Sequence, residues 1–138
     1  MSIQHPAGLA EQYRGVLQTQ AANSSGVVEW IWNNAQTTLA LTWVGAPSAN
    51  LSAGFQSAYQ NAQTKVSNLA LTGQGNATIG GHTWEYQTYS FQSNGVAGYL
   101  TVALSYYSSS GRLYGLLFQD TSPGTLVQLQ KYGDTFSG

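Results

Sequence analysis

The residues that could carry acid–base or nucleophilic chemistry are few in this chain. It has two histidines, His5 near the start and His82 after a Gly-Gly pair, and Glu85 is the carboxylate nearest to His82 in sequence. Residues three positions apart on a strand point to opposite faces, so His82 and Glu85 do not form the base and acid of a triad. No serine stands in the G-x-S-x-G sequence of a nucleophile elbow. We therefore expect a protein that is not an enzyme, with a hydrolase using His82 as a distant alternative.

The sequence also offers little for metal or cofactor binding. Cysteine is absent, which excludes disulfides, thiolate catalysis and cysteine-based zinc or iron–sulfur sites. The glycine sequences at 73–75 and 80–81 lack the helix N-terminus and lysine of a phosphate-binding loop, so we interpret them as turns. The carboxylates are too dispersed for paired-carboxylate hydrolysis or a metal site; they are Glu11, Glu29, Glu85, Asp120 and Asp134. We expect no catalytic residue, no metal and no cofactor.

Two pairs of aromatic residues could bind a flat ligand. Trp30 and Trp32 are two positions apart, and Trp84 and Tyr86 repeat that spacing close to His82. If exposed on a strand, each pair would offer ring faces to a glycan, a lipid or a pigment. Large aromatics at this spacing more often pack beneath a helix, so burial in the core is the favoured interpretation.

Three asparagines stand in the N-x-S/T sequence of a glycosylation site, namely Asn23, Asn50 and Asn76. In a chain so rich in asparagine, serine and threonine, one or two such matches arise by chance. The pattern does not decide whether any of them is modified.

The composition indicates a surface that is polar but nearly uncharged. Only 7% of the 138 residues are charged, against about 25% in a typical soluble protein. The net charge of −1 excludes the basic surface that binds nucleic acid or anionic membrane, and no apolar run is long enough to span a membrane. A net charge close to zero promotes association, which favours an exported protein, extracellular or at the cell surface, that is present as a mature chain without its export signal.

Residues 1–26 are poorly patterned, and we expect an N-terminal arm or tail. Its apolar residues would share one side of a short helix or lie on an extended segment; they include Leu9, Tyr13, Val16 and Leu17. An extended arm could add a strand to a neighbouring molecule.

Residues 27–138 predict a single α+β domain, in which a mostly antiparallel sheet of about six strands is covered by two helices. The helices are expected at about 48–66, with Ser48 as N-cap, and at about 123–136, with Ser122 capping and Pro123 in the first helical position. Turn sequences rich in glycine, serine and asparagine separate the strands. The strands are expected at 27–34, 37–46, 68–79, 82–92, 96–107 and 112–120.

The run 96–107 alternates large apolar residues with smaller ones. Leu100, Val102 and Leu104 are expected to face the core, whereas the face of Thr101 and Ser105 is expected to be a wetter contact surface.

The strands between 86 and 107 carry no charge and no proline, the features that normally protect free sheet edges. They are therefore interpreted as open to strand addition. We predict a self-assembling subunit, as a homo-oligomer or filament, or a module that docks on another exported protein. The candidate interface residues are Tyr13, Val16, Leu17, Tyr99 and Tyr107.

The order of these elements resembles the PsbP-like α/β/α sandwich over about Val27 to Phe136. The strand GRLYGLLF, which leads through a Ser/Pro turn into a helix ending in DTF, also carries this resemblance. The family is known from extrinsic photosystem proteins and from exported bacterial proteins and lipoproteins. The resemblance implies a sandwich fold and a binding or assembly role without a shared catalytic residue.

Overall fold

The structure, a computed structural model, describes residues 10–14, 26–32, 37–45, 51–134 and 136; for residues 10–14 and 26–32 only the backbone is described. The described residues form seven strands and two helices. These are β1 (Ala10–Arg14), β2 (Gly26–Trp32), β3 (Thr37–Gly45), α1 (Leu51–Gln63), β4 (Ser67–Ile79), β5 (His82–Ser93), β6 (Val96–Tyr107), β7 (Arg112–Asp120) and α2 (Thr125–Gly133). The expected α+β class is confirmed. The sheet has one strand more than expected because part of the N-terminal segment forms β1.

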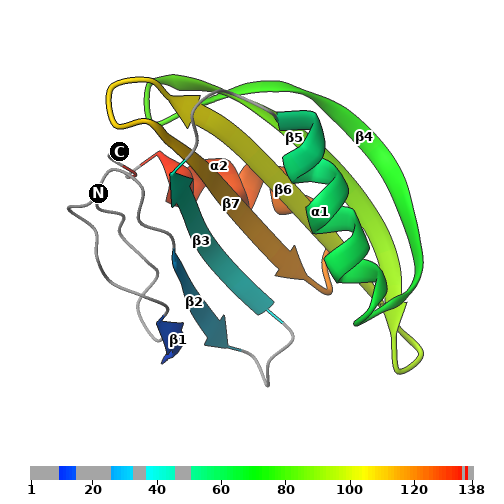
Figure 1. The fold of residues 1–138 in the computed structure, drawn as a ribbon. Coiled ribbons are helices and arrows are strands. Elements are labelled where there is room, and N and C mark those ends of the chain that lie inside the picture. The colour runs from blue at the N-terminus through cyan, green and yellow to red at the C-terminus, as the bar shows by residue number, and fades with distance from the viewer. Residues whose placement is uncertain (1–9, 15–25, 33–36, 46–50, 135, 137–138) are drawn as a thin grey trace.

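All seven strands belong to one antiparallel sheet in the order β1-β2-β3-β7-β6-β5-β4 (Figure 1). Strands that follow one another in the sequence pair with each other, except that β3 pairs with β7 and not with β4. The pairing of β3 with β7 aligns Leu39 with Phe118 and Trp43 with Tyr114. This long-range pairing joins the β1–β3 part of the sheet to the β4–β6 part through β7, and β1 and β4 are the two edge strands.

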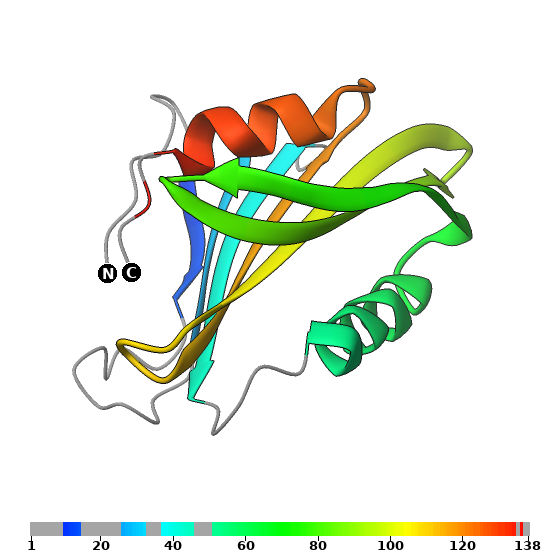
Figure 2. The same ribbon diagram turned by 90° about the horizontal axis from the view of Figure 1, so that it is seen from above.

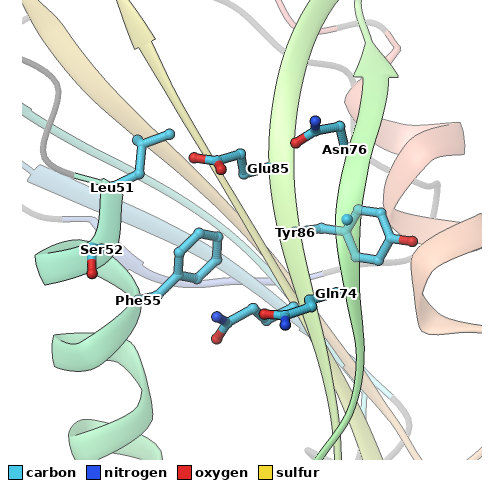
Figure 3. A pocket seen from close by; sticks show the side chains of 9 residues that line it. Leu51, Ser52, Phe55, Gln74, Asn76, Glu85 and Tyr86 are labelled. Atoms are coloured by element: carbon cyan, nitrogen blue, oxygen red, sulfur yellow. The ribbon is translucent and has the colours of Figure 1, made fainter.

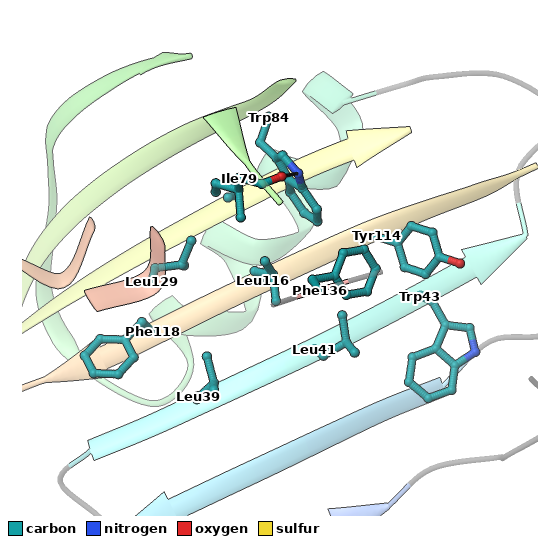
Figure 4. Close-up of a cluster of buried hydrophobic side chains, with 11 residues drawn as sticks. Leu39, Leu41, Trp43, Ile79, Trp84, Tyr114, Leu116, Phe118, Leu129 and Phe136 are labelled. Carbon is teal, nitrogen blue, oxygen red and sulfur yellow. Dashed lines mark hydrogen bonds between the residues drawn. The ribbon is translucent and has the colours of Figure 1, made fainter. Parts of the chain in front are cut away.

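The larger hydrophobic core lies between the sheet and α2. Alternate residues of β3 and β7 point to this side, as the period of two in a strand requires. Leu129 of α2 and Phe136 pack onto them, and both are buried (Figure 4). The strand residues of this core are Leu39, Leu41, Trp43, Ile79, Trp84, Ala103, Tyr114, Leu116 and Phe118.

A second core lies on the opposite face, beneath α1. Phe55 is the buried residue of this helix, and it packs with residues of β5 and β6. The helices therefore cover opposite faces of a strongly twisted sheet (Figure 2). The strand residues of this core are Tyr89, Phe91, Leu100, Val102 and Leu104.

Strand β6 is covered on both faces, so the expectation that its Thr101 and Ser105 face is a hydrated contact surface is wrong. Thr101 is fully buried and Ser105 is 3% exposed. The Oγ1 atoms of Thr101 and Thr125 lie 2.8 Å apart in a hydrogen bond that joins β6 to α2. The small side chains on this face leave room for α2, because bulky residues there would hold the helix away from the sheet.

Both helices are shorter than expected. Ser48, the expected N-cap of α1, lies outside the described residues. Helix α2 begins at Thr125, so Ser122 does not cap it and Pro123 is not its first residue. Gly124 is the N-cap instead, with a φ of 91° that a side chain would disfavour. With 13 and 9 residues, neither α1 nor α2 is long and apolar enough to cross a bilayer, which takes about 20 residues.

Candidate functional site

The β4 edge, defined as the side of Ser67–Ile79 that faces away from β5, is the longer of the two sheet edges. β4 has thirteen residues and forms the outer rim of the sheet, whereas β1 has five (Figure 1). β4 contains no charged residue and no proline. Most of its side chains are exposed, including Leu71 at 49%. The β4 edge thus lacks the charges and prolines that commonly prevent strand pairing between molecules.

The strands expected to be open to strand addition are interior. β5 pairs with β4 and β6, and β6 pairs with β5 and β7, so their backbone groups are used within the sheet. The expectation for residues 86–107 is therefore wrong. The neighbouring edge strand, β4, nevertheless also lacks charged residues and proline.

The turn between β4 and β5 determines which backbone groups of β4 face outward. Gly80 and Gly81 have φ angles of 60° and 74°, as a type I′ hairpin turn requires. In such a hairpin Ile79 and His82 form the hydrogen-bonded closing pair, and the pairs alternate from there. The outward N–H and C=O groups next to the turn therefore belong to Thr78, Asn76 and Gln74.

A second feature is the α1 cleft, an apolar cavity of about 860 Å³ between α1 and the centre of the sheet. Its floor is made by one face of β3 and β7; the floor residues include Thr38, Ala40, Thr42, Leu113, Gly115 and Leu117. Helix α1 packs mainly on β6 and β4, so it does not cover these two strands. The cavity opens beside the helix and reaches residues of the core beneath it, such as Phe91 and Leu104.

Small residues keep the α1 cleft open. On β3, Ala40 and Thr42 face the cleft, whereas Leu41 and Trp43 face the α2 core. On β7, a Cβ atom at Gly115 would lie 2.5 Å from Thr42 Oγ1. On the helix, a Cβ atom at Gly54 would lie 2.7 Å from Leu104 Cδ1, so a larger residue would require the Leu104 side chain to shift. The small size of the residues on both the sheet wall and the helix wall therefore leaves the space that forms the cavity.

A third, polar depression of about 600 Å³ lies on the other side of α1, against β4 and β5 (Figure 3). Gln74 and Glu85 lie on the side of Leu51 and Phe55, while Tyr86 points away from them. Amide and carboxylate groups here can bind a hydrated polar partner. The depression has a single carboxylate, so it does not provide the paired carboxylates of a glycosidase.

The two residues of the second expected ligand platform, Trp84 and Tyr86, differ in how far they are buried. Trp84 is 0% exposed, and its Nε1 donates a hydrogen bond of 3.1 Å to the carbonyl of Ile79, so Trp84 belongs to the core and is not a platform. Tyr86 is half-buried, packs against the same core and lies across Gly75. The backbones of Trp30 and Trp32 pair with Leu39 and Thr37, and their side chains lie outside what the structure describes. The spacing of two was a correct sign of core packing for Trp84.

Of the expected interface residues, the structure describes the side chains of Tyr99 and Tyr107, which lie toward opposite ends of β6. Tyr107 lies in a ring cluster with Trp84, Tyr114 and Phe136, and burial raises its pKa above the usual 10.0. Tyr99 is half-buried at the other end of β6 and pairs with Ser90. The backbone of Tyr13 is part of β1, whereas Val16 and Leu17 lie outside the described residues.

His82 joins this ring cluster. Its imidazole stacks on Tyr107, with ring centroids 4.0 Å apart and planes at 20°. Across the part of the chain that the structure describes, no group of three or more His, Cys, Asp or Glu could hold a metal ion. Of the three glycosylation sequences, Asn76 is exposed on β4, and Asn23 and Asn50 lie outside the described residues.

The α1 cleft was not expected from sequence. A signal for it exists in TTLALTW, where one face of β3 is large and apolar and the other holds Thr38, Ala40 and Thr42. Such alternation normally indicates an exposed face. Only the position of α1 over the neighbouring strands turns this face into the wall of a cavity.

The fold defines the chain as a small α/β sandwich protein. No protein-family model and no curated protein matches the sequence. The structure is similar to LpqN of Mycobacterium tuberculosis, described as involved in cell envelope biogenesis, with a TM-score of 0.58, 13% identity, and 96% of this chain and 79% of that chain covered. It is also similar to PA94 of Pseudomonas aeruginosa, a protein of unknown function, with a TM-score of 0.54, 11% identity, and 94% and 96% covered. At these identities the likeness shows the fold alone, and the expected PsbP-like family is not confirmed.

Proposed function

We propose that this chain is a non-catalytic, exported interaction domain, and that two copies associate by antiparallel pairing of their β4 edges. The observation that carries this proposal is a thirteen-residue strand without charge or proline at the open end of the sheet. An edge without charge or proline is a template for another strand, and the register shifts of β4 confine its regular part to residues 73–79.

A second copy is the partner that best matches the β4 edge. Two β4 strands have the same length, and an antiparallel pair related by a two-fold axis is self-complementary and closes as a dimer. A filament would require β4 to pair with the opposite edge of the next molecule. That edge, β1, has five residues and contains Glu11 and Arg14, so most of β4 would stay unpaired. The geometry therefore favours a dimer over an open filament.

The charge distribution supports association on this side of the molecule. From Leu51 to Gly111 the sequence contains only two residues with full charge, Lys65 and Glu85. Two copies that approach through β4 therefore meet little like-charge repulsion.

The low charge of the whole chain supports export, since association is the expected behaviour of such a surface. The description of LpqN as a cell-envelope protein is consistent with this location.

Mutation of Asn76 provides a direct test. Proline at this position removes one outward N–H and leaves the pairing with β5 intact, because proline is tolerated on edge strands. We expect the wild type to be a dimer by size-exclusion chromatography with light scattering, and N76P to be a monomer with an unchanged far-UV circular dichroism spectrum.

The matched control is Asn76→Ala, which removes the same side chain but retains the N–H. We expect N76A to dimerise as the wild type does. A wild-type monomer at every accessible concentration would contradict the proposal, as would an N76P variant that still dimerises. Particles that grow in size with concentration would indicate an open assembly and refute the two-fold pairing.

A further inference from the structure

We infer that the α1 cleft binds one single-chain fatty acid, with its hydrocarbon chain along the floor and its carboxylate next to Lys65. This inference concerns a different surface from the β4 edge and does not depend on dimerisation. The cavity of about 860 Å³ lies within the range of about 300–1,000 Å³ that small-molecule sites occupy.

The polarity of the cleft changes along its length. At one end of the β3–β7 ladder Val44 pairs with Leu113, and at the other end Thr38 pairs with Gln119. The first turn of α1 lies near the apolar end, because Gly54 is close to Leu104 and Leu113. The cleft therefore has an apolar body and a polar end.

Helix α1 runs along the sheet toward the polar end (Figure 1), where Asn61 and Lys65 line the cleft. Lys65 is the one charged residue among those that line it, and its side chain is exposed. A cation at the polar end of an apolar channel is complementary to an amphiphile with an anionic head group. Asn61 and Gln119 add amide groups that can donate hydrogen bonds to a carboxylate.

The walls favour a flexible chain over a flat ligand. Among the lining residues Phe91 is the one aromatic, and the others are aliphatic, small or polar. A sugar or a pigment is usually held between ring faces, which this cleft does not provide. An acyl chain needs only apolar contact along its length, which the part-exposed Val44, Leu113 and Leu117 supply.

Isothermal titration calorimetry with dodecanoate below its micellar concentration tests this inference. We expect saturable binding with one dodecanoate per chain. Dodecyltrimethylammonium has the same chain and the opposite charge, and we expect it to bind more weakly. Lys65→Met should weaken dodecanoate binding roughly two- to fivefold, the effect of one partly exposed ion pair. It should also reduce the preference for the anion, whereas Lys131→Met, on the exposed side of α2, should change neither.

Two variants that fill the cleft from exposed positions test its location. Thr42→Phe places a ring on the floor, and Ser57→Phe places one on the helix wall; both positions are exposed, so neither change disturbs a core. We expect both to abolish binding of dodecanoate. Thr83→Phe, at an exposed position of β5 outside the cleft, should bind as the wild type does.

The outcomes that overturn the inference are distinct from those that overturn dimerisation. N76P leaves the cleft unchanged and should bind dodecanoate normally. Absence of saturable binding to the wild type, or binding that survives both T42F and S57F, would refute the fatty-acid site. Flotation with phosphatidylglycerol vesicles without binding of dodecanoate would also refute it, since that result indicates a membrane surface.

Discussion

His82 and Tyr107 stack face to face, with ring centroids 4.0 Å apart, although they lie 25 positions apart in the sequence. His82 follows the β4–β5 turn, and Tyr107 ends β6. The imidazole covers one side of a ring cluster that continues through Trp84 and Phe136 into the core. A histidine that sequence considerations single out for catalysis thus contacts an aromatic ring.

This stack leads to a prediction about alkaline pH. Burial raises the pKa of Tyr107 above the unfolded value of 10.0. The folded state therefore retains the phenol proton after the unfolded state has lost it. The stability that this proton contributes is complete below pH 10 and is lost as the pH rises through the folded pKa.

His82→Ala would uncover the ring of Tyr107, so we expect its phenolate to form at a lower pH. Absorbance at the phenolate band, followed from neutral to alkaline pH, measures this shift, and Tyr107→Phe identifies the transition. A second late transition is expected from Tyr89, whose pKa is also raised by burial. If His82→Ala leaves the titration of Tyr107 unchanged, the stack does not contribute to its burial.

The hydrogen bond between Thr101 and Thr125 yields a second prediction. Both residues are buried, and their Oγ1 atoms are 2.8 Å apart. Thr125→Val would leave the hydroxyl of Thr101 buried without this partner, and we expect the free energy of unfolding to fall by about 1–3 kcal/mol. Urea denaturation measures the loss.

The double variant Thr101→Val with Thr125→Val serves as the control. It removes both hydroxyls, so we expect it to be more stable than T125V alone. Equal stability of T125V and wild type would show that the hydrogen bond contributes nothing to the packing of α2 on β6.

A third prediction concerns Gly98 on β6. The ring of Phe91 on β5 lies directly over this residue, and a Cβ atom there would be 2.4 Å from Phe91 Cε2. Gly98→Ala should therefore displace the ring and destabilise the fold by about 1–3 kcal/mol, the usual effect of overpacking. Thermal or urea unfolding checks the magnitude.

The pair can be tested by a double-mutant cycle. Phe91→Leu removes the ring, so we expect Gly98→Ala to be less harmful in that background. If the losses of unfolding free energy in the two single variants simply add in the double variant, the effect of Gly98→Ala does not arise from contact with the Phe91 ring.

Much of the local structure could be predicted from the sequence. Gly80, Gly81, Gly95 and Gly111 lie in the turns between the strands β4 to β7. All four have positive φ angles, which glycine adopts most easily, so their positions in the sequence correctly indicate these turns. The alternation of Leu39, Leu41 and Trp43 in β3 likewise predicts a strand with one buried face. These features depend on neighbours in the chain and on the preferences of single residues.

The first turn of α2 shows where local reasoning fails. Ser122 and Pro123 are common helix-starting residues, yet the helix begins after Gly124. The hydroxyl of Thr125 is hydrogen-bonded to Thr101 of β6, so the first residue of the helix is also fixed by a contact with the sheet. No preference of the residues 122–125 encodes that contact.

The sequence by itself determined an α+β fold, the strands between 68 and 120 and a surface with few charges, and it favoured the burial of Trp84, because these follow from residue type and spacing. Only the tertiary structure decided that β4 rather than β5 or β6 is an edge, and that a cavity opens beside α1. Both depend on the insertion of β7 between β3 and β6, a pairing of residues more than 65 positions apart in the case of β3 and β7. Pairing at such separation is governed by how all the strands and helices pack together, which no local pattern records.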